Sequence, residues 1–470
     1  MDGRRWFSHQ PNVTGRGIVA GYSTRFWVTV VVLGVVTGAI AAGFGELLRL
    51  VEHVAYGYSS GPFLDGVAAS VGWRHFAALM VAAALVIGGR LLLGRAHAPG
   101  ATEVSESLWL SEARLPLVSS FVRGTLAIVT VGLGSSLGRE SAPQLGGAAL
   151  ASWVAELEQL PIWQRRLLVA SGAGAGFAAI YDVPLGGALF ALEVLLGTVS
   201  LPFVLPALVM SVSATAVAWA VLGTHPTYSL PHYALHPGQQ LVWALLAGPI
   251  IGFAAIGWVR MVKLAVRIRP QGRGRFVAPV LVFAALAAVS LKYPQLLGNG
   301  KGVVQVEALG GYSLGLLVVL LALKPLATTS CLAAGAPGGL FTPTLTIGVL
   351  LAGVLGTIWT HVWGGVPIGS YAVIGGAAFL AAAMQGPLSG VVLMLELTRN
   401  FDSLMVPTLL AVAEATVIAR KLGAPSIYSA RLRPDPDAFS ARSAGAAAIS
   451  TLDRAGVPPP EPEDDPQPDA

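Results

Sequence analysis

Charged residues are scarce in this chain. They make up 11% of its 470 residues, whereas hydrophobic residues make up 54%. Soluble domains carry about 25% charged residues, so a soluble fold of this length would have too few charges to cover its surface. The chain has one cysteine, Cys331, which excludes a disulfide framework or a cysteine-based metal cluster within one chain. The scarcity of charge therefore indicates extensive contact with lipid.

Long apolar stretches recur between residues 26 and 418, and glycine and proline interrupt several of them. A membrane-spanning helix needs about 20 apolar residues, and some of these stretches are shorter. Unpaired backbone groups are costly in lipid, so broken helices persist only inside protein or beside a water-filled cavity. The pattern predicts an all-α integral membrane protein whose broken and tilted helices surround a binding site.

Basic residues are concentrated between the apolar stretches, and the densest group runs from Arg260 to Arg275. Loops rich in lysine and arginine stay on the cytoplasmic side of a membrane. We therefore expect a multi-pass protein of the plasma or inner membrane with both termini in the cytoplasm. No cleavable signal peptide is evident. Without a soluble basic domain and interleaved aromatic residues, a nucleic acid is not an expected partner.

The two halves of the chain contain a repeated segment. Residues 184–193 and residues 387–396 both begin with Pro-Leu, carry glycine at the fourth position and end in glutamate nine positions after the proline. Internal repeats with interrupted helices are typical of transporters that bind their substrate between the repeats. The predicted organisation is a cytoplasmic segment (1–24), a first membrane repeat (25–224), a proline-containing linker (225–238), a second repeat (239–432) and a disordered cytoplasmic tail (433–470).

Two glycine-rich segments precede apolar helices and are candidates for an anion site. The first contains Gly138, Arg139 and Glu140, an ionisable pair in an apolar region, and the second runs from Gly335 to Pro343. A helix N-terminus offers free N–H groups and the positive end of a dipole to an anion. The simpler alternatives are a Glu–Arg pair at a helix end for the first segment and an ordinary helix start for the second.

These segments, in this order, resemble the anion-binding signatures of the CLC family of chloride channels and chloride/proton antiporters. Gly138-Arg139-Glu140 resembles one signature and residues 338–343 a second, while residues 98–103 appear in the place of a third, and residues 426–430 resemble the segment that supplies the family's pore tyrosine. The resemblance covers about residues 26–432. It implies two inverted repeats, a homodimer, and chloride or a similar small anion as the transported partner, with protons as a further candidate and no cofactor or metal.

The resemblance also implies the site residues. Glu140 would be the gate, since its carboxylate can occupy an anion site and leave it on protonation. The anion-binding residues would be Pro99, Gly100, Gly138, Arg139, Glu140, Gly339, Leu340, Phe341 and Tyr428, with backbone N–H groups and the tyrosine hydroxyl as donors. Partial charges of this kind bind an anion weakly enough to permit its release.

The chain departs from the family pattern at three places. Proline follows the gating glutamate one position late, at Pro143. Pro99 stands where the family has a serine donor, which makes nitrate an alternative anion. Val194 stands where many exchangers have a second glutamate, and valine cannot relay a proton. The departure at Val194 favours channel-like passage, with chloride/proton or nitrate/proton antiport as the alternative.

Two further charged residues have alternative interpretations. Glu193 is either part of a proton path or a structural acceptor of buried backbone N–H groups. Lys324 either lends positive potential to a cytoplasmic vestibule or reaches the membrane interface by snorkelling, and snorkelling is the preferred interpretation.

Three rival functions are less compatible with the sequence. A secondary transporter of an organic anion needs a larger, charged pocket. A membrane-embedded enzyme needs a nucleophile–base or metal constellation, which eight scattered histidines do not suggest. A fluoride-specific relative fits Tyr428 and the glutamate segment less well.

Overall fold

The computed structural model describes residues 22–95, 104–234, 236–400 and 404–432. Its regular structure is helical, apart from a backbone bridge between Gly138 and Gly339. The elements are α1 (Thr24–Tyr56), α2 (Phe63–Ala69), α3 (Gly72–Arg95), α4 (Val104–Leu110), α5 (Leu117–Gly132), α6 (Ser141–Leu157), α7 (Ile162–Tyr181), α8 (Pro184–Leu189), the π-helix η2 (Phe190–Leu196), α9 (Leu201–Leu222), α10 (Pro237–Arg267), α11 (Gly274–Ser290), the 3-10 turn η3 (Pro294–Leu296), α12 (Lys301–Ala308), α13 (Leu314–Ala333), α14 (Phe341–Val362), α15 (Ile368–Met384), α16 (Pro387–Thr398), α17 (Met405–Lys421) and the 3-10 turn η4 (Ser429–Arg431).

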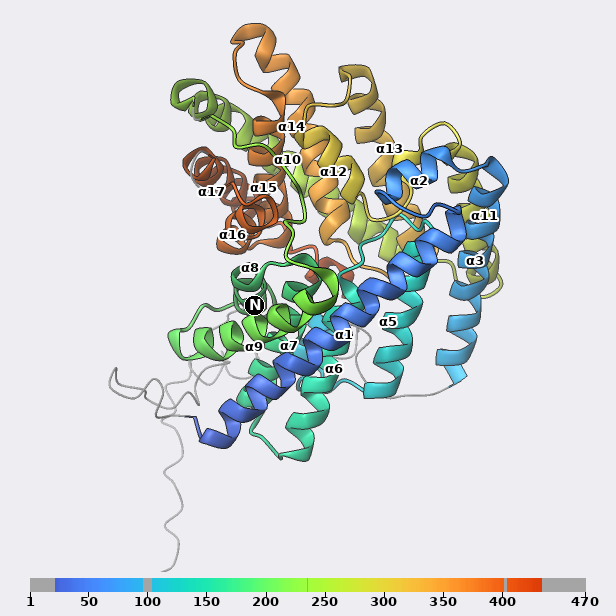
Figure 1. The fold of residues 1–470 in the computed structure, drawn as a ribbon, viewed down its shortest axis with the longest axis vertical. Coiled ribbons are helices and arrows are strands. Elements are labelled where there is room, and N and C mark those ends of the chain that lie inside the picture. The colour runs from blue at the N-terminus through green and yellow to red at the C-terminus, as the bar shows by residue number, and fades with distance from the viewer. Residues whose placement is uncertain (1–21, 96–103, 235, 401–403, 433–470) are drawn as a thin grey trace, which may run out of the picture. The chain divides into compact units, whose positions relative to one another are not determined.

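Six of these helices are long and apolar enough to cross a membrane: α1, α3, α9, α10, α13 and α14. Shorter apolar helices, such as α15 and α16, lie between them. Figure 1 shows α1 running across α5, α6 and α7, while α10, α14, α15 and α17 gather in another part of the molecule. The predicted all-α membrane protein with interrupted helices is confirmed.

The chain breaks at equivalent places just before each of the two repeated segments. Asp182 ends α7 with a φ of 58°, and Gln385 ends α15 with a φ of 61°. Each is followed by a short helix that begins at a proline, Pro184 in α8 and Pro387 in α16. Proline suits the first turn because its missing N–H needs no partner there. The left-handed residue turns the chain, and the proline restarts it in a new direction.

Glu193 and Glu396 connect the two repeated segments reciprocally. Glu193 accepts the N–H groups of Leu388 and Ser389 at 3.1 and 2.6 Å. Glu396 accepts those of Leu185 and Gly186, again at 3.1 and 2.6 Å. Because each glutamate lies in the later part of its own segment and contacts the start of the other, the two segments run antiparallel, as inverted repeats require. The boundaries at 25–224, 225–238 and 239–432 stay a prediction.

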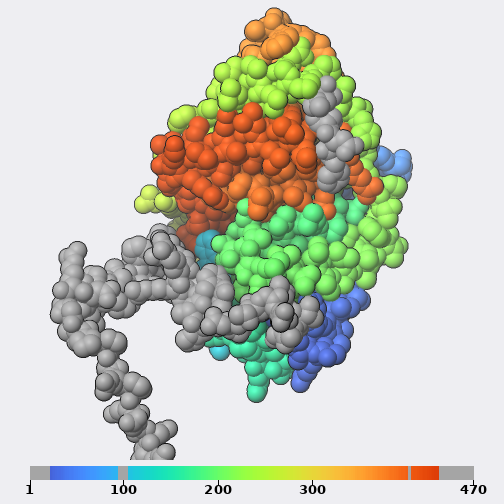
Figure 2. Space-filling model, turned by 90° about the vertical axis from the view of Figure 1, so that its left-hand side faces the viewer, coloured from blue at the N-terminus to red at the C-terminus, as the bar shows by residue number. Residues whose placement is uncertain are grey.

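Small residues allow the helices to pack closely, which is how helices associate where lipid replaces water. A β-carbon on Gly147 of α6 would overlap the carbonyl oxygen of Gly172 on α7, and Gly176 lies equally close to Pro143. The run from Gly172 to Gly176 is therefore a packing face. In Figure 2, one face of the molecule shows the green segments around residues 180–230 beside the orange to red segments near 380–430.

Candidate anion-binding site

The two glycine-rich segments meet at the starts of α6 and α14. Gly138 and Gly339 exchange backbone hydrogen bonds of 2.7 and 2.8 Å. Glu140 directly precedes the first residue of α6, and Leu340 directly precedes the first residue of α14. Segments about 200 residues apart thus present two helix N-termini to the same place.

The Glu140 carboxylate lies at the N-terminus of α14. Its Oε1 accepts the backbone N–H of Phe341 at 2.7 Å, and its Oε2 accepts the Tyr181 hydroxyl at 3.1 Å. The side chain is buried, with 1% exposure. A β-carbon on either Gly138 or Gly339 would overlap the carboxylate, so both glycines are needed for this close approach. The carboxylate occupies the position from which a free anion would accept the Phe341 N–H.

Arg139 points away from the Glu140 carboxylate. Its guanidinium lies over the Tyr181 ring, 4.8 Å from the centroid, and Nη2 donates to the Ile180 carbonyl at 3.3 Å. Among the described residues, no ion pair joins it to Glu140. The alternative of a Glu–Arg pair at a helix end is therefore wrong, and the α14 terminus binds the carboxylate through a dipole and neutral donors.

A cavity of about 830 Å³ lies beside the site, and we call it the Arg139 cavity. Charged side chains of both signs line it, among them Arg49, Glu52, Arg139 and Lys301, and Tyr181 forms part of its wall. The Tyr181 hydroxyl contacts Glu140. One aromatic side chain therefore connects this cavity to the Glu140 carboxylate.

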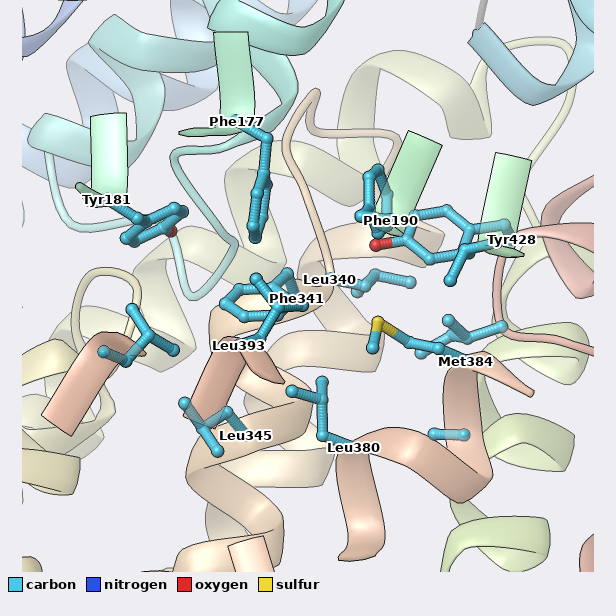
Figure 3. Close-up of a cluster of buried hydrophobic side chains, with 14 of the residues drawn as sticks. Phe177, Tyr181, Phe190, Leu340, Phe341, Leu345, Leu380, Met384, Leu393 and Tyr428 are labelled. Atoms are coloured by element: carbon cyan, nitrogen blue, oxygen red, sulfur yellow. The ribbon is translucent and has the colours of Figure 1, made fainter. Parts of the chain in front are cut away.

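Aromatic rings surround the start of α14 (Figure 3). Phe341 makes edge contact with Phe177 at 4.7 Å between centroids, and Phe190 makes edge contact with Tyr428 at 5.5 Å. Figure 3 shows the Tyr428 hydroxyl turned from its own backbone toward Phe190. The adjacent Ile427 N–H donates to the Ala383 carbonyl at 2.8 Å, which fixes this segment against α15. The site is apolar apart from a few N–H and O–H groups.

The structure brings most of the predicted anion-site residues together. Gly138, Glu140, Gly339 and Phe341 are in direct contact, Leu340 is buried beside them, and Tyr428 belongs to the same aromatic cluster. Arg139 lines the Arg139 cavity instead of facing the carboxylate. Pro99 and Gly100 lie outside the described residues.

The three residues predicted for a proton path or vestibule lie elsewhere. Glu193 binds the start of α16, which agrees with the structural interpretation, and Val194 is buried with 5% exposure against Gly386. The predicted snorkelling of Lys324 is wrong, because its side chain has 1% exposure. Its ammonium donates to the carbonyls of Leu296 and Gly298 at 3.0 and 3.1 Å, so backbone acceptors compensate for its burial.

Sequence reasoning missed two hydroxyl groups. Tyr181 lies 2.6 Å from Thr342 between hydroxyl oxygens, and both reach Glu140 Oε2, at 3.1 and 3.4 Å. Thr342 lies within the second signature and Tyr181 lies just before the first repeated segment. Nothing in their spacing indicates a shared contact, because they are 161 positions apart.

The comparisons with known proteins identify the family of this chain. Residues 80–420 match the family described as voltage gated chloride channel. The H(+)/Cl(-) exchange transporter ClcA of Vibrio parahaemolyticus is 28% identical over 444 residues, which is 90% of this chain and 92% of the relative. The voltage-gated ClC-type chloride channel ClcB of Salmonella dublin is 29% identical over 412 residues, which is 84% and 96%.

The fold also matches solved structures. The crystal structure of a slow cyanobacterial Cl-/H+ antiporter superposes with a TM-score of 0.75 at 20% identity, covering 87% of this chain and 97% of that one. Family match, relatives and fold agree over most of the chain. The chain therefore belongs to the CLC family of voltage-gated chloride channels and chloride/proton exchange transporters.

Proposed function

We propose that this protein exchanges chloride, or a similar small anion, for protons across a membrane, with Glu140 as the group that both substrates use. The observation that carries the proposal is the hydrogen bond from the Phe341 N–H to Glu140 Oε1. One donor group serves the gate carboxylate, and the same donor is available to an anion only after the carboxylate has left.

Competition for this donor links the two substrates. A charged Glu140 carboxylate is held by the α14 terminus and excludes an anion from it. Protonation removes the charge, which weakens the attraction to the helix terminus and allows the side chain to leave. Protonation of Glu140 and anion binding at Phe341 both favour the state in which the carboxylate has left the α14 terminus. Protonation therefore strengthens anion binding, and anion binding favours protonation. Leu340 and Tyr428 are the proposed further donors, and Gly138 and Gly339 provide the space.

The site suits a small anion that must also leave. Phe341 and its neighbours offer partial charges, and the Arg139 guanidinium is directed to the Tyr181 ring. Binding without a full positive charge in contact is weak enough for conduction. The donors at the α14 N-terminus lie among aromatic side chains, and the charged Arg139 cavity lies beside them, so these donors themselves suit a small anion better than an organic one.

Proton coupling is better supported than channel-like passage. The relative from Vibrio is named an exchange transporter, and the cyanobacterial structure is that of a Cl-/H+ antiporter. The buried Val194 remains the argument for a channel, together with the relative from Salmonella, which is named a channel. An exchanger built this way needs a proton path that bypasses Val194.

The test is anion efflux from liposomes that contain the purified protein, with external pH recorded simultaneously. We expect a chloride gradient to drive protons uphill in the opposite direction. Chloride flux without coupled protons would replace the exchanger by a channel. Absence of chloride flux from folded protein would shift the proposal to nitrate or fluoride, and a series of anions that includes organic acids distinguishes these possibilities.

We also propose a homodimer with cytoplasmic termini in the cell membrane. Exposed apolar side chains on α9 and α17, such as Leu201, Trp219, Val406 and Leu409, support a surface that faces lipid or a second copy. The mass of the detergent-solubilised particle tests the dimer, and accessibility of an added terminal tag from either side of intact cells tests the orientation.

A further inference from the structure

Two hydroxyl groups from different helices converge on one oxygen of the gate carboxylate. Tyr181 ends α7 and Thr342 lies in the first turn of α14. Their side-chain oxygens are 2.6 Å apart, and they lie 3.1 and 3.4 Å from Glu140 Oε2. Tyr181 has 1% exposure and Thr342 has none, so bulk water does not replace these contacts.

The donors and acceptors fit in one particular order when Glu140 is charged. A carboxylate only accepts hydrogen bonds, and each hydroxyl has one proton to donate. The shorter contact to Oε2 comes from Tyr181, so Tyr181 donates to the carboxylate. Thr342 then donates to the Tyr181 oxygen at 2.6 Å. Both hydroxyl protons are used, and the short chain of hydrogen bonds ends on the negative charge.

The order reverses when Glu140 carries a proton. A protonated Oε2 can donate to the Tyr181 oxygen, and Tyr181 can then donate to Thr342 Oγ1. The Glu140 and Tyr181 protons then have acceptors without movement of any heavy atom, but the Thr342 proton loses the Tyr181 oxygen as its acceptor. The pair therefore satisfies the charged carboxylate more completely than the protonated one, and it opposes departure of the charged carboxylate, which would leave the Tyr181 proton without its charged acceptor.

We propose that Tyr181 and Thr342 form a latch that holds the charged Glu140 carboxylate in the closed position and sets the pH at which the gate opens. They are positioning residues, since they act on the anion only through Glu140. This inference rests on the proposed gating role of Glu140. It adds that hydroxyl donors, as well as the α14 terminus, determine the fraction of time for which the gate is closed.

The other polar and titratable groups around Glu140 do not replace the latch. Arg139 precedes Glu140 in the chain and stacks on Tyr181. Arg431 of η4 attracts the Glu140 carboxylate at longer range, and Tyr228 lies in the segment between α9 and α10. Within the described part of the chain, no side-chain hydrogen bond joins the carboxylate to Arg139, Arg431 or Tyr228, whereas Phe341 and Tyr181 donate to it and Thr342 supports Tyr181.

The test compares Tyr181→Phe, Thr342→Val and the double variant in full-length protein, by chloride efflux from liposomes across a pH series. Removal of a hydrogen bond to a charged group should make release of the carboxylate easier, so Tyr181→Phe should raise flux at high pH and shift the midpoint of its pH dependence upward by about one unit. Thr342→Val should shift it in the same direction by less. The double variant should resemble Tyr181→Phe alone, because the two hydroxyls act in series.

Matched controls remove equivalent hydroxyls elsewhere. Tyr371 on α15 and Thr416 on α17 are buried, and their hydroxyls have no hydrogen-bond partner among the described residues. Tyr371→Phe and Thr416→Val should keep the wild-type midpoint and flux. A wild-type midpoint and high-pH flux in folded Tyr181→Phe would overturn the latch, as would equal shifts in the controls.

Two further comparisons keep the latch and the gate distinguishable. If Tyr181→Phe does not fold, two variants of Thr342 test the latch instead. Thr342→Ser retains a hydroxyl and should keep the wild-type midpoint, while Thr342→Val should shift it. Identical behaviour of these two variants overturns the latch. If wild-type flux does not depend on pH, protonation of Glu140 is not the gate. In that case, increased flux in Tyr181→Phe still supports a latch on the carboxylate, and unchanged flux overturns both proposals.

Discussion

Gly339 lies so close to Glu140 that a β-carbon on the glycine would overlap carboxylate Oε1. The glycine comes from the second repeat and the glutamate from the first. Because Gly339 has no side chain, it leaves the space that the carboxylate of the proposed gate, Glu140, occupies.

Gly339→Ala should keep this gate from closing. The overlapping atom is at the end of a flexible side chain, so the carboxylate can move away and the fold should survive. Chloride flux at high pH should rise severalfold and lose most of its pH dependence. Gly43→Ala is the matched control, since a β-carbon there meets nothing within 4 Å. Unchanged efflux in Gly339→Ala would mean that the carboxylate does not block the pathway from this position.

Glu140→Gln should abolish the pH dependence of anion flux that comes from gating, and leave only the weak alkaline decline expected from Lys301. Glutamine has nearly the same shape and does not titrate, so its interaction with the Phe341 N–H no longer changes with pH. Proton movement coupled to chloride should disappear, while chloride still passes. Efflux and external pH measured in the same liposomes check this result, and a pH dependence equal to that of the wild type would remove Glu140 from the gating role.

Glu193→Gln and Glu396→Gln should each lower stability by about 1.5–3 kcal/mol, the usual range for hydrogen bonds to a charged group. The two residues accept equivalent N–H groups at the same distances, so the two variants control for each other. Thermal unfolding in detergent measures the loss. If Glu193 belonged to a proton path, its variant alone would lose proton coupling, and the structural interpretation would fail.

Lys301 should make flux decline in alkaline solution. Burial, followed by the nearby Arg139 charge, lowers the pKa of Lys301 to about 8. Lys301 is the first residue of α12, outside the six candidate spans, and lines the Arg139 cavity. Below that pKa the ammonium attracts anions, and as pH rises through it the charge is lost.

The change in flux should have the size expected from the loss of one elementary charge at Lys301. An elementary charge roughly 8 Å from an anion in water changes its local concentration about two- to threefold. In a Glu140→Gln background, which removes titration of the gate, flux should fall by this factor between about pH 7 and pH 9. Lys301→Arg should stay active at the higher pH, because arginine remains charged. If the Glu140→Gln protein and the Glu140→Gln protein that also carries Lys301→Arg had equal flux at high pH, Lys301 would be excluded as an attractor of anions.

The main features of the fold could be predicted from the sequence because they rest on local patterns. Apolar stretches interrupted by glycine and proline predicted broken membrane helices, and the segments at 184–193 and 387–396 predicted related halves. The position of a break was harder to predict. Asp182 ends α7 with a positive φ. A positive φ at a helix end is usually indicated by a glycine in the sequence, and this position has an aspartate instead.

The site was predictable where the chain itself brings donors and glycines together, as in residues 338–343. It was not predictable where contacts join distant side chains. The Tyr181–Thr342 contact depends on how α7 and α14 cross, and the environment of Lys324 depends on carbonyls 28 and 26 positions away in the chain. Hydrophobicity suggested an interfacial lysine, and only the folded backbone supplies the acceptors that keep it buried.

The backbone hydrogen bonds between Gly138 and Gly339 restrict how this gate can work. They fasten the loops before α6 and α14 to each other, so the two helix ends cannot separate without breaking them. The proposed opening therefore requires only rotation about the single bonds of the Glu140 side chain. Rotation of a side chain is far faster than the movement of a domain. In the proposed exchange, these two loops stay joined while the carboxylate moves, and the rate at which Glu140 gains and loses its proton limits how often an anion can pass.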